Sequence, residues 1–97
     1  MENPVIITEL LWDEETVLHI QSKHQVEPQE VEELCFAEDI PLIEVGRGGA
    51  PIYYVLGQTL GGRYLFIVIC YLFRGKAKVI TARDMDQHEK RRYNRRR

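Results

Sequence analysis

The spacing of apolar residues predicts two short helices in the first half of the chain. The first helix opens at Trp12–Asp13, where Asp13 is a good N-cap, and it ends near Lys23–His24, whose cations suit a helix C-terminus. Pro28 suits the first turn of a second helix. Apolar residues then recur at i, i+3 and i+4, namely Val31, Leu34 and Cys35. The short turn between the two segments predicts a helical hairpin.

Runs of β-branched and aromatic residues, separated by glycine-bearing turns, predict four strands in the second half. They span Ile40–Val45, Ile52–Gly57, Arg63–Phe73 and Lys76–Ala82. The third run is apolar on both faces, which favours a central position. Because the connections are short, we expect an antiparallel meander with the helical hairpin on one face. The run from 4 to 11 is either an edge strand or an extended lead-in.

A basic helix is predicted at the C-terminal end. Its cationic stripe consists of His88, Arg91, Arg92, Arg95 and Arg96, and the adjoining stripe of Met85, Glu89 and Tyr93. The second stripe is thin for a packing face, so we expect a loosely held helix. The arginine stripe suits phosphate oxygens. Two alternatives remain, in which the arginines pair with acidic residues of the same chain or are simply solvated.

These elements predict an α+β fold, with an N-terminal helical hairpin packed on a mainly antiparallel four-stranded sheet and a C-terminal basic helix. Residues 1–97 form a single domain in this interpretation, and 44% hydrophobic with 29% charged residues is typical of a soluble fold. The longest apolar run is too short to span a membrane, and the N-terminus lacks the features of a signal peptide. Cys35 and Cys70 are expected to be reduced, packed thiols. A cytoplasmic location without membrane contact is therefore expected.

Charge is distributed very unevenly along the chain. The net charge is −2, but from Arg74 onward ten Lys or Arg residues face three acids, whereas residues 1–50 carry twelve acids and two cations. Because screening limits fields to about 8–10 Å, a partner senses one strongly positive end. Such an end attracts the phosphates of nucleic acid.

The order of local motifs resembles that of the BrnT-type (DUF497) toxins. The matching residues are Trp12–Asp13, Lys23–His24, Val26, Glu30, Glu33, Gly62–Arg63, Ile80–Arg83 and Glu89–Tyr93. The resemblance covers about residues 10 to 95 and implies a RelE-like fold. It also implies a toxin of a type II toxin–antitoxin system, which cleaves RNA and is inhibited by a ribbon-helix-helix antitoxin. Operator DNA would be bound only through the complex with the antitoxin.

Several positions depart from the family pattern. Gln25 and Glu27–Pro28 replace the usual glycine and hydroxyl cap, and Asp84 stands where many members have a second arginine. The segment 46–49 and the pair Tyr53–Tyr54 are also individual to this chain. A non-catalytic nucleic-acid- or protein-binding module of the same fold therefore stays open as the alternative function.

Metal-independent RNA cleavage needs a base, an acid and fixed cations around the phosphate. Arg83 ends one predicted strand and Arg63 begins its neighbour, so both can reach one end of the sheet as a phosphate clamp. His24 is the best acid or base, because an imidazole titrates near pH ~6.5. Glu89 and Tyr93 complete the candidate catalytic set, since they could orient His24. The candidate RNA-binding residues are Lys23, Arg91, Arg92, Arg95 and Arg96.

Each candidate also has a structural interpretation. Arg63 and Arg83 could be ion-pair partners of Glu89 or Asp13, and His24 could simply cap or pack a helix end. Tyr93 could be a ring packed on the sheet. The cysteines and histidines have no zinc-ligand spacing, and no motif indicates a cofactor. We therefore expect neither a metal nor a cofactor.

Overall fold

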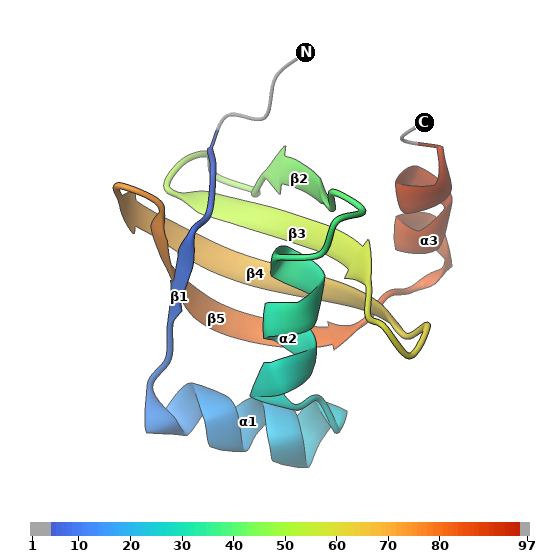
Figure 1. Cartoon of the computed structure of the whole chain (residues 1–97), viewed down its shortest axis with the longest axis horizontal. Helices are drawn as coiled ribbons and strands as arrows, with labels where there is room; N and C mark the ends of the chain where they lie inside the picture. The colour runs from blue at the N-terminus through green and yellow to red at the C-terminus, as the bar shows by residue number, and fades with distance from the viewer. Residues whose placement is uncertain (1–4, 96–97) are drawn as a thin grey trace.

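A computed structural model describes residues 5–95 and shows a five-stranded sheet with three helices (Figure 1). The strands are β1 (Glu9–Leu11), β2 (Leu42–Val45), β3 (Ile52–Gln58), β4 (Tyr64–Phe73) and β5 (Lys76–Asp84). The helices are α1 (Glu14–His24), α2 (Pro28–Cys35) and α3 (Gln87–Asn94). The spatial order of the strands is β1-β5-β4-β3-β2. The α+β class is therefore confirmed.

Strands β2 to β5 form the predicted antiparallel meander, with the long apolar strand β4 inside it. The prediction of only four strands is wrong, because β1 adds a fifth at the edge and pairs with β5 in parallel. Of the two alternatives for residues 4–11, the edge strand is therefore confirmed for Glu9–Leu11. Its pairing begins at the β4–β5 turn, where Gly75 O accepts from the N–H groups of Thr8 and Glu9. Long-range pairing of this kind leaves little local signal in the sequence.

The helices α1 and α2 cover one face of the sheet, which we call the helix face. They differ from the predicted helical hairpin, because they lie across one another, with α1 packed on β5 and α2 on β3 (Figure 1). Gln25 ends α1 in a left-handed conformation at φ 52° and turns the chain between them. Trp12 packs against the core beneath these helices and donates from Nε1 to Glu32 Oε2 at 2.9 Å.

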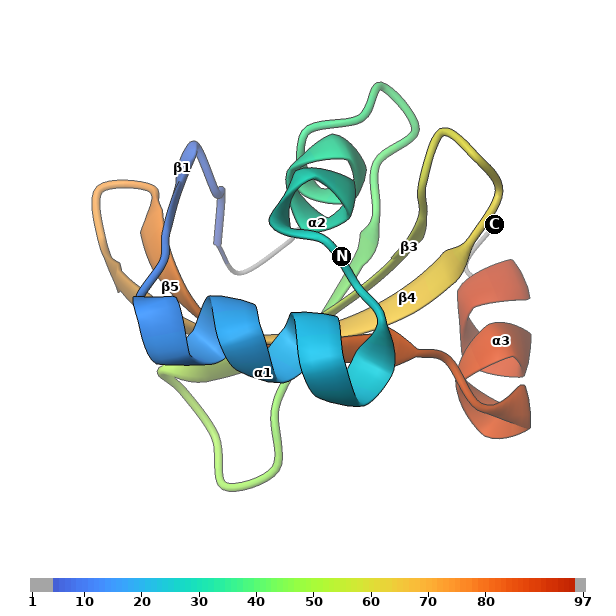
Figure 2. The same cartoon turned by 90° about the horizontal axis from the view of Figure 1, so that it is seen from below.

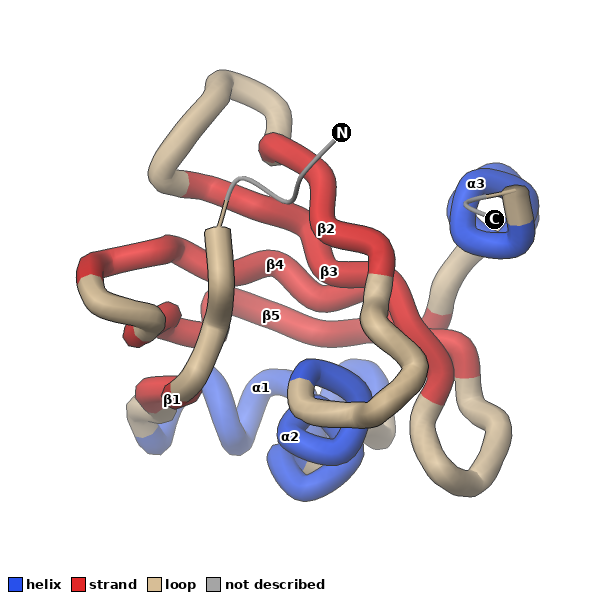
Figure 3. The backbone as a smooth tube through the Cα atoms, turned by 45° about the horizontal axis from the view of Figure 1, so that its top comes forward, coloured by secondary structure: helices blue, strands red, loops and turns tan. Residues whose placement is uncertain are grey.

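Two hydrophobic clusters lie on the two sides of the sheet. The larger one fills the space between the helix face and α1 and α2, and it includes Ile20, Leu34, Leu65, Ile67, Ile69 and Val79. The smaller cluster consists of Leu56, Phe66, Met85 and Tyr93 and lies beneath α3 on the opposite side, the open face. Figure 3 shows α3 at one end of this side, apart from α1 and α2. The alternation of side chains along β4 therefore supplies both clusters.

Helix α3 is fixed more firmly than its composition suggests. Asp86 and Glu89 form a capping box, with Glu89 N–H donating to Asp86 Oδ1 at 2.8 Å and Asp86 N–H donating to Glu89 Oε1 at 2.9 Å. Glu89 and Tyr93 are both buried. None of the helices within residues 5–95 has the length and apolar character needed to cross a bilayer.

Candidate nucleic-acid interface

Arg83 is the penultimate residue of β5 and lies on the open face of the sheet. It pairs with Phe66 of β4, whereas the next residue, Asp84, pairs with Leu65. Consecutive residues of a strand point to opposite faces. The side chain of Arg83 therefore points to the open face, and that of Asp84 points to the helix face.

The open face carries a hollow beside α3, which we call the basic groove. It has a volume of about 690 Å³ and is lined by Arg47, Ile52, Tyr54, Phe66, Val68, Arg83, Glu89 and Arg92. Strands β3, β4 and β5 supply the floor, α3 forms one wall, and the β2–β3 loop supplies Arg47. Figure 2 shows this loop projecting from the side of the sheet away from α2. The size is in the range of sites for small ligands, about 300–1,000 Å³.

Arg83 and Glu89 form a two-pronged ion pair within the groove. Nη1 and Nη2 of Arg83 donate to the two carboxylate oxygens of Glu89, each at 2.8 Å. The guanidinium also lies over the ring of Phe66, with Cζ 4.3 Å from the ring centroid. Burial alone would raise the pKa of Glu89, but the hydrogen bonds from Arg83 and from the Asp86 N–H outweigh it and lower that pKa. Glu89 is thus a carboxylate at neutral pH.

Arg92 forms a second two-pronged pair, with Glu44 of β2. Its Nε and Nη2 donate to the two oxygens of Glu44 at 3.1 and 3.0 Å. The hydrogen bonds that Arg92 donates to Glu44 are the main reason that the pKa of Arg92 is raised. Together with the Arg83–Glu89 pair, it ties α3 to both β2 and β5. These two pairs hold α3 by contacts that its thin apolar stripe did not predict, since the sequence did not show that Glu89 and Glu44 reach Arg83 and Arg92.

Arg47 and Tyr54 form the part of the groove that the sequence analysis did not anticipate. The backbone N–H of Arg47 donates to the hydroxyl of Tyr54 at 3.0 Å, and the Tyr54 ring lies 4.9 Å from that of Phe66. The side chain of Arg47 makes no ion pair with any residue from 5 to 95. The alternation of side chains along β3 could have predicted that Tyr54 lies on this face. It could not have predicted the contact of Tyr54 with Arg47, because that contact depends on the conformation of the β2–β3 loop.

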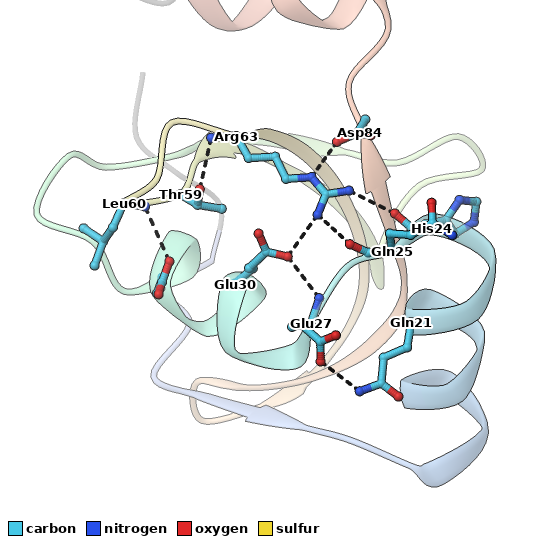
Figure 4. A network of polar contacts seen from close by, with 10 residues as sticks. Gln21, His24, Gln25, Glu27, Glu30, Thr59, Leu60, Arg63 and Asp84 are labelled. Carbon is cyan, nitrogen blue, oxygen red and sulfur yellow. Dashed lines mark hydrogen bonds and ion pairs between the residues drawn. The ribbon is translucent and has the colours of Figure 1, made fainter.

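Arg63 lies at the same end of the sheet as Arg83, but its side chain is on the helix face (Figure 4). Its Nε donates to Asp84 Oδ1 at 2.7 Å, and Nη1 donates to Glu30 Oε1 at 3.0 Å. The remaining bonds run to the backbone carbonyls of Gln25 and His24, at 2.6 and 2.9 Å. Every guanidinium nitrogen thus has an acceptor within the chain. The hydrogen bond to Asp84 is the main reason that the pKa of Arg63 is raised.

The two arginines therefore do not form a shared clamp in this arrangement, because the sheet separates their side chains. The ion-pair alternative is confirmed for Arg83 with Glu89, whereas Arg63 pairs with Glu30 and Asp84. Asp13 is paired instead with Lys78, at 3.2 Å. The departure at Asp84 thus has a structural reason, since its carboxylate holds Arg63.

His24 ends α1 and does not line the basic groove. Its ring packs edge-on against His19 with centroids 5.2 Å apart, and its carbonyl accepts from Arg63. Burial lowers the pKa of His24, and the nearby His19 and Arg83 lower it further. The imidazole is therefore neutral at neutral pH and close enough to Arg83 to sense its charge.

The other candidate residues lie around α3 and the end of α1. Tyr93 is buried beside Tyr64, with ring centroids 5.9 Å apart, as expected for a packed ring. The residues Lys23, Arg91 and Arg95 are exposed, and Arg96 lies outside the described residues. The predicted stripe is thus divided, because Arg92 turns inward to Glu44 while Arg91 stays at the surface beside His88.

The arrangement of histidines, cysteines and acids bears on metal binding and thiol chemistry. No group of three or more His, Cys, Asp or Glu residues between 5 and 95 is arranged to share a metal ion. Burial raises the pKa of the Cys35 thiol to about 12, so this cysteine is a neutral packed group. The two cysteines are free thiols.

Comparison with known proteins supplies the family. A family model described as "Ribonuclease toxin, BrnT, of type II toxin-antitoxin system" matches residues 12–89. The 1.1 Å crystal structure of the Brucella abortus ribonuclease toxin BrnT superposes with a TM-score of 0.64 at 16% identity, covering 81% of this chain and 97% of that one. A search of curated proteins gives no match. The family match spans most of the chain and includes every element from α1 to the start of α3, so this protein belongs to the BrnT family of toxins of type II toxin–antitoxin systems.

Proposed function

We propose that this protein is a metal-independent endoribonuclease whose RNA substrate lies in the basic groove. The observation that carries the proposal is the groove itself, whose lining includes three arginines, Arg47, Arg83 and Arg92, and the aromatic rings of Tyr54 and Phe66. Cations and aromatic rings together are the features that bind single-stranded nucleic acid. Membership of a family named for ribonuclease toxins supports the same activity.

In the proposed reaction the ribose 2′-hydroxyl attacks the adjacent phosphate, and the 5′-oxygen leaves. Arg83 stabilises the charge that develops on the phosphate, because its planar fork can grip two oxygens. To do so, the phosphate replaces the carboxylate of Glu89, which accepts two hydrogen bonds from the Arg83 guanidinium in the free protein. Glu89 is then released beside the substrate as an ionised carboxylate, which can accept the proton of the 2′-hydroxyl.

The other candidate residues take supporting roles in this proposal. The leaving oxygen takes its proton from water in this proposal, because His24 lies at the end of α1 outside the groove and its imidazole is neutral. Tyr93 holds α3 against the sheet and so positions Glu89. Arg63 joins the α1–α2 turn to β5 and supports the position of Arg83 without phosphate contact.

Exposed cations around the groove extend the surface available to RNA. These are Lys23, Arg91 and Arg95, with Arg96 beyond the described residues. Arg92 would join them once a phosphate displaces Glu44. Each such phosphate contact contributes salt-dependent affinity through the release of counterions.

The partner that follows from the family is an antitoxin. We propose one of the ribbon-helix-helix type, which blocks the groove and carries the complex to operator DNA. A co-expressed antitoxin that restores growth and that co-purifies with the protein would support this assignment.

The test of the activity is incubation of purified, partner-free protein with mixed single-stranded RNA in EDTA, followed by mapping of the ends. The expected products carry 2′,3′-cyclic or 3′-phosphate ends and are lost with Arg83→Ala. The control is Arg74→Asn, which removes an arginine of the β4–β5 turn outside the groove. Asn tolerates the left-handed backbone of that position, φ 54°.

A non-catalytic binding module is the second candidate function. The specific observation in its favour is that both Arg83 and Arg92 are already neutralised by carboxylates of the same chain. Intact RNA in the assay above, together with salt-dependent binding of that RNA, would identify this function.

A further inference from the structure

Arg47 is the groove-lining arginine whose guanidinium makes no ion pair with residues 5–95. The other two arginines of the groove, Arg83 and Arg92, each face a carboxylate at hydrogen-bonding distance, whereas no carboxylate of the described residues lies within 4 Å of the Arg47 guanidinium. Arg47 therefore keeps its full set of donors for a ligand in the groove. Because the pairs of Arg83 and Arg92 suffice to fix α3, Arg47 has no evident part in holding the fold.

The loop that carries Arg47 is well defined, which makes it suitable for recognition. Gly46 N–H donates to Ile52 O at 2.8 Å, and Gly49 N–H donates to Gly46 O at 2.9 Å. A side chain at Gly46 would meet Ile52 Cγ2 at 2.7 Å, so the loop can pack this closely only around glycine. The bond from Arg47 N–H to the Tyr54 hydroxyl then fixes Arg47 relative to the ring of Tyr54.

Tyr54 supplies a half-buried aromatic ring beside this guanidinium. The ring is tilted by 48° against Phe66 and lies on the floor of the groove, next to Val68 and Ile52. Stacking of a base on such a ring contributes about 1–3 kcal/mol, and larger rings stack more strongly. A base could therefore stack on the ring of Tyr54 and accept hydrogen bonds from the guanidinium of Arg47 beside it.

We propose that Arg47 and Tyr54 form a base-recognition subsite that takes a guanine of single-stranded RNA. A base that is read by donors alone must present neighbouring acceptors, and the O6 and N7 atoms of guanine match the arginine fork. Stacking on Tyr54 favours the same base, because a purine covers more of the ring. The inference rests on the proposed function, since it assumes that the groove binds RNA, and it adds the base that the groove selects.

The position of the subsite also indicates where the RNA is cut. Arg83, which holds the reacting phosphate in the proposed mechanism, lines the same groove across the ring of Phe66. A guanine on Tyr54 therefore lies in a nucleotide adjacent to the reacting phosphate. Cleavage should accordingly occur next to guanines rather than at random.

The test is the binding of uridine-rich hexamers that carry one central guanine, adenine, cytosine or uracil. Every ribose of these hexamers carries a 2′-O-methyl group, which removes the attacking hydroxyl and prevents cleavage. Binding is measured by fluorescence anisotropy. The guanine oligomer should bind about 5- to 150-fold more tightly than the others, which corresponds to the 1–3 kcal/mol typical of one bidentate base contact. Arg47→Ala should remove this preference, and Arg74→Asn should leave it unchanged.

Two tyrosine variants separate stacking from positioning. Tyr54→Phe keeps the ring but loses the hydroxyl that fixes Arg47, so the guanine preference should fall while the affinity for uridine stays the same. The matched control is Tyr53→Phe, which removes the hydroxyl of the neighbouring residue, buried toward the helix face. Circular dichroism of each variant checks that the fold is retained.

The outcomes separate this inference from the proposed function. Equal binding of all four oligomers, a preference for another base, or a guanine preference that survives in Arg47→Ala would overturn the subsite, even if the protein cleaves RNA. Guanine-selective binding that depends on Arg47 without any cleavage of natural RNA would support the subsite and overturn the endoribonuclease. Absence of both binding and cleavage would overturn both.

Discussion

Arg83 and Asp84 are neighbours in β5, yet their side chains serve opposite faces of the sheet. Arg83 binds Glu89 of α3 on the open face, with both contacts at 2.8 Å, whereas Asp84 accepts from Arg63 Nε on the helix face at 2.7 Å. These two consecutive residues therefore link the basic groove to the contacts of Arg63 on the helix face. Substitution of Arg83, in the groove, and of Arg63, on the helix face, should consequently have different effects on RNA cleavage.

Arg83→Ala should abolish RNA cleavage. Removing a fixed donor that stabilises transition-state charge typically costs about 100- to 1,000-fold in rate. The free energy of unfolding should also fall, by about 1.5–3 kcal/mol, because Glu89 would lose its charged hydrogen bonds while buried. Cleavage rates and urea unfolding measure the two effects, and Arg83→Ala cleaving at the normal rate would exclude Arg83 from the reaction.

Arg63→Ala should act mainly on stability. The substitution removes four hydrogen bonds that join the start of β4 to the end of α1, to α2 and to Asp84. The free energy of unfolding should therefore fall by about 1.5–3 kcal/mol. Arg63→Lys should recover little of this loss, because an ammonium lacks the planar fork. If Arg63→Ala loses cleavage while its urea midpoint is unchanged, Arg63 contacts the substrate after all.

Glu44→Gln should increase the affinity for single-stranded RNA. The carboxylate of Glu44 occupies the fork of Arg92, and a neutral amide competes less strongly with a phosphate for that fork. The expected change is a several-fold lower Kd and a steeper dependence on salt, measured by anisotropy between 50 and 200 mM salt. The matched variant is Glu38→Gln, an exposed acid that does not line the groove. Equal effects of the two variants would mean that only the net charge matters.

The protein should lose stability in acid. The folded state lowers the pKa of Asp84 through the hydrogen bond from Arg63, and it lowers the pKa of Glu89 through Arg83 and Asp86 against the effect of burial. Groups of this kind stabilise the fold above their unfolded pKa values, near 4, and the contribution disappears as the pH falls through the lower folded values. Urea unfolding between pH 2 and 7 should therefore show a falling midpoint below about pH 4.

Glu89→Gln provides the control for this acid sensitivity. The amide does not titrate, so the variant should be less stable at pH 7 and should show a shallower decline in acid. A decline as steep as that of the natural sequence would place the responsible carboxylates elsewhere.

Gly75→Ala should detach β1 from the sheet. Gly75 has φ +84°, and a Cβ there would collide with the side chain of Thr8, next to β1. Gly48→Ala is the matched control, because Gly48 has φ +92° with nothing within 4 Å of a Cβ. The control should cost only the left-handed strain of about 1–2 kcal/mol, and Gly75→Ala should cost more. Thr8→Ala in the same chain should recover part of the difference, as measured by urea unfolding.

Local patterns were sufficient for much of this fold. The apolar period of α2, the Asp13 cap of α1 and the glycine-bearing turns around β3 and β4 placed most elements close to their observed bounds. These signals depend on neighbours in the chain, so they can be read without the tertiary structure. The motifs around Arg83 and Glu89 likewise led to the family, and an ion pair of Arg83 with Glu89 was one of the alternatives that the sequence left open.

Long-range contacts decided the rest. Only the tertiary structure shows that β1 pairs with β5, that Arg63 and Arg83 face opposite sides, and that the loop at Arg47 meets Tyr54. Each of these depends on a register or a turn that brings together residues far apart in the chain, and a shift of one residue would reverse the face. Local sequence patterns were thus enough for most of the helices and strands and for the family, whereas the packing of the sheet placed β1 and selected the cations that share the groove.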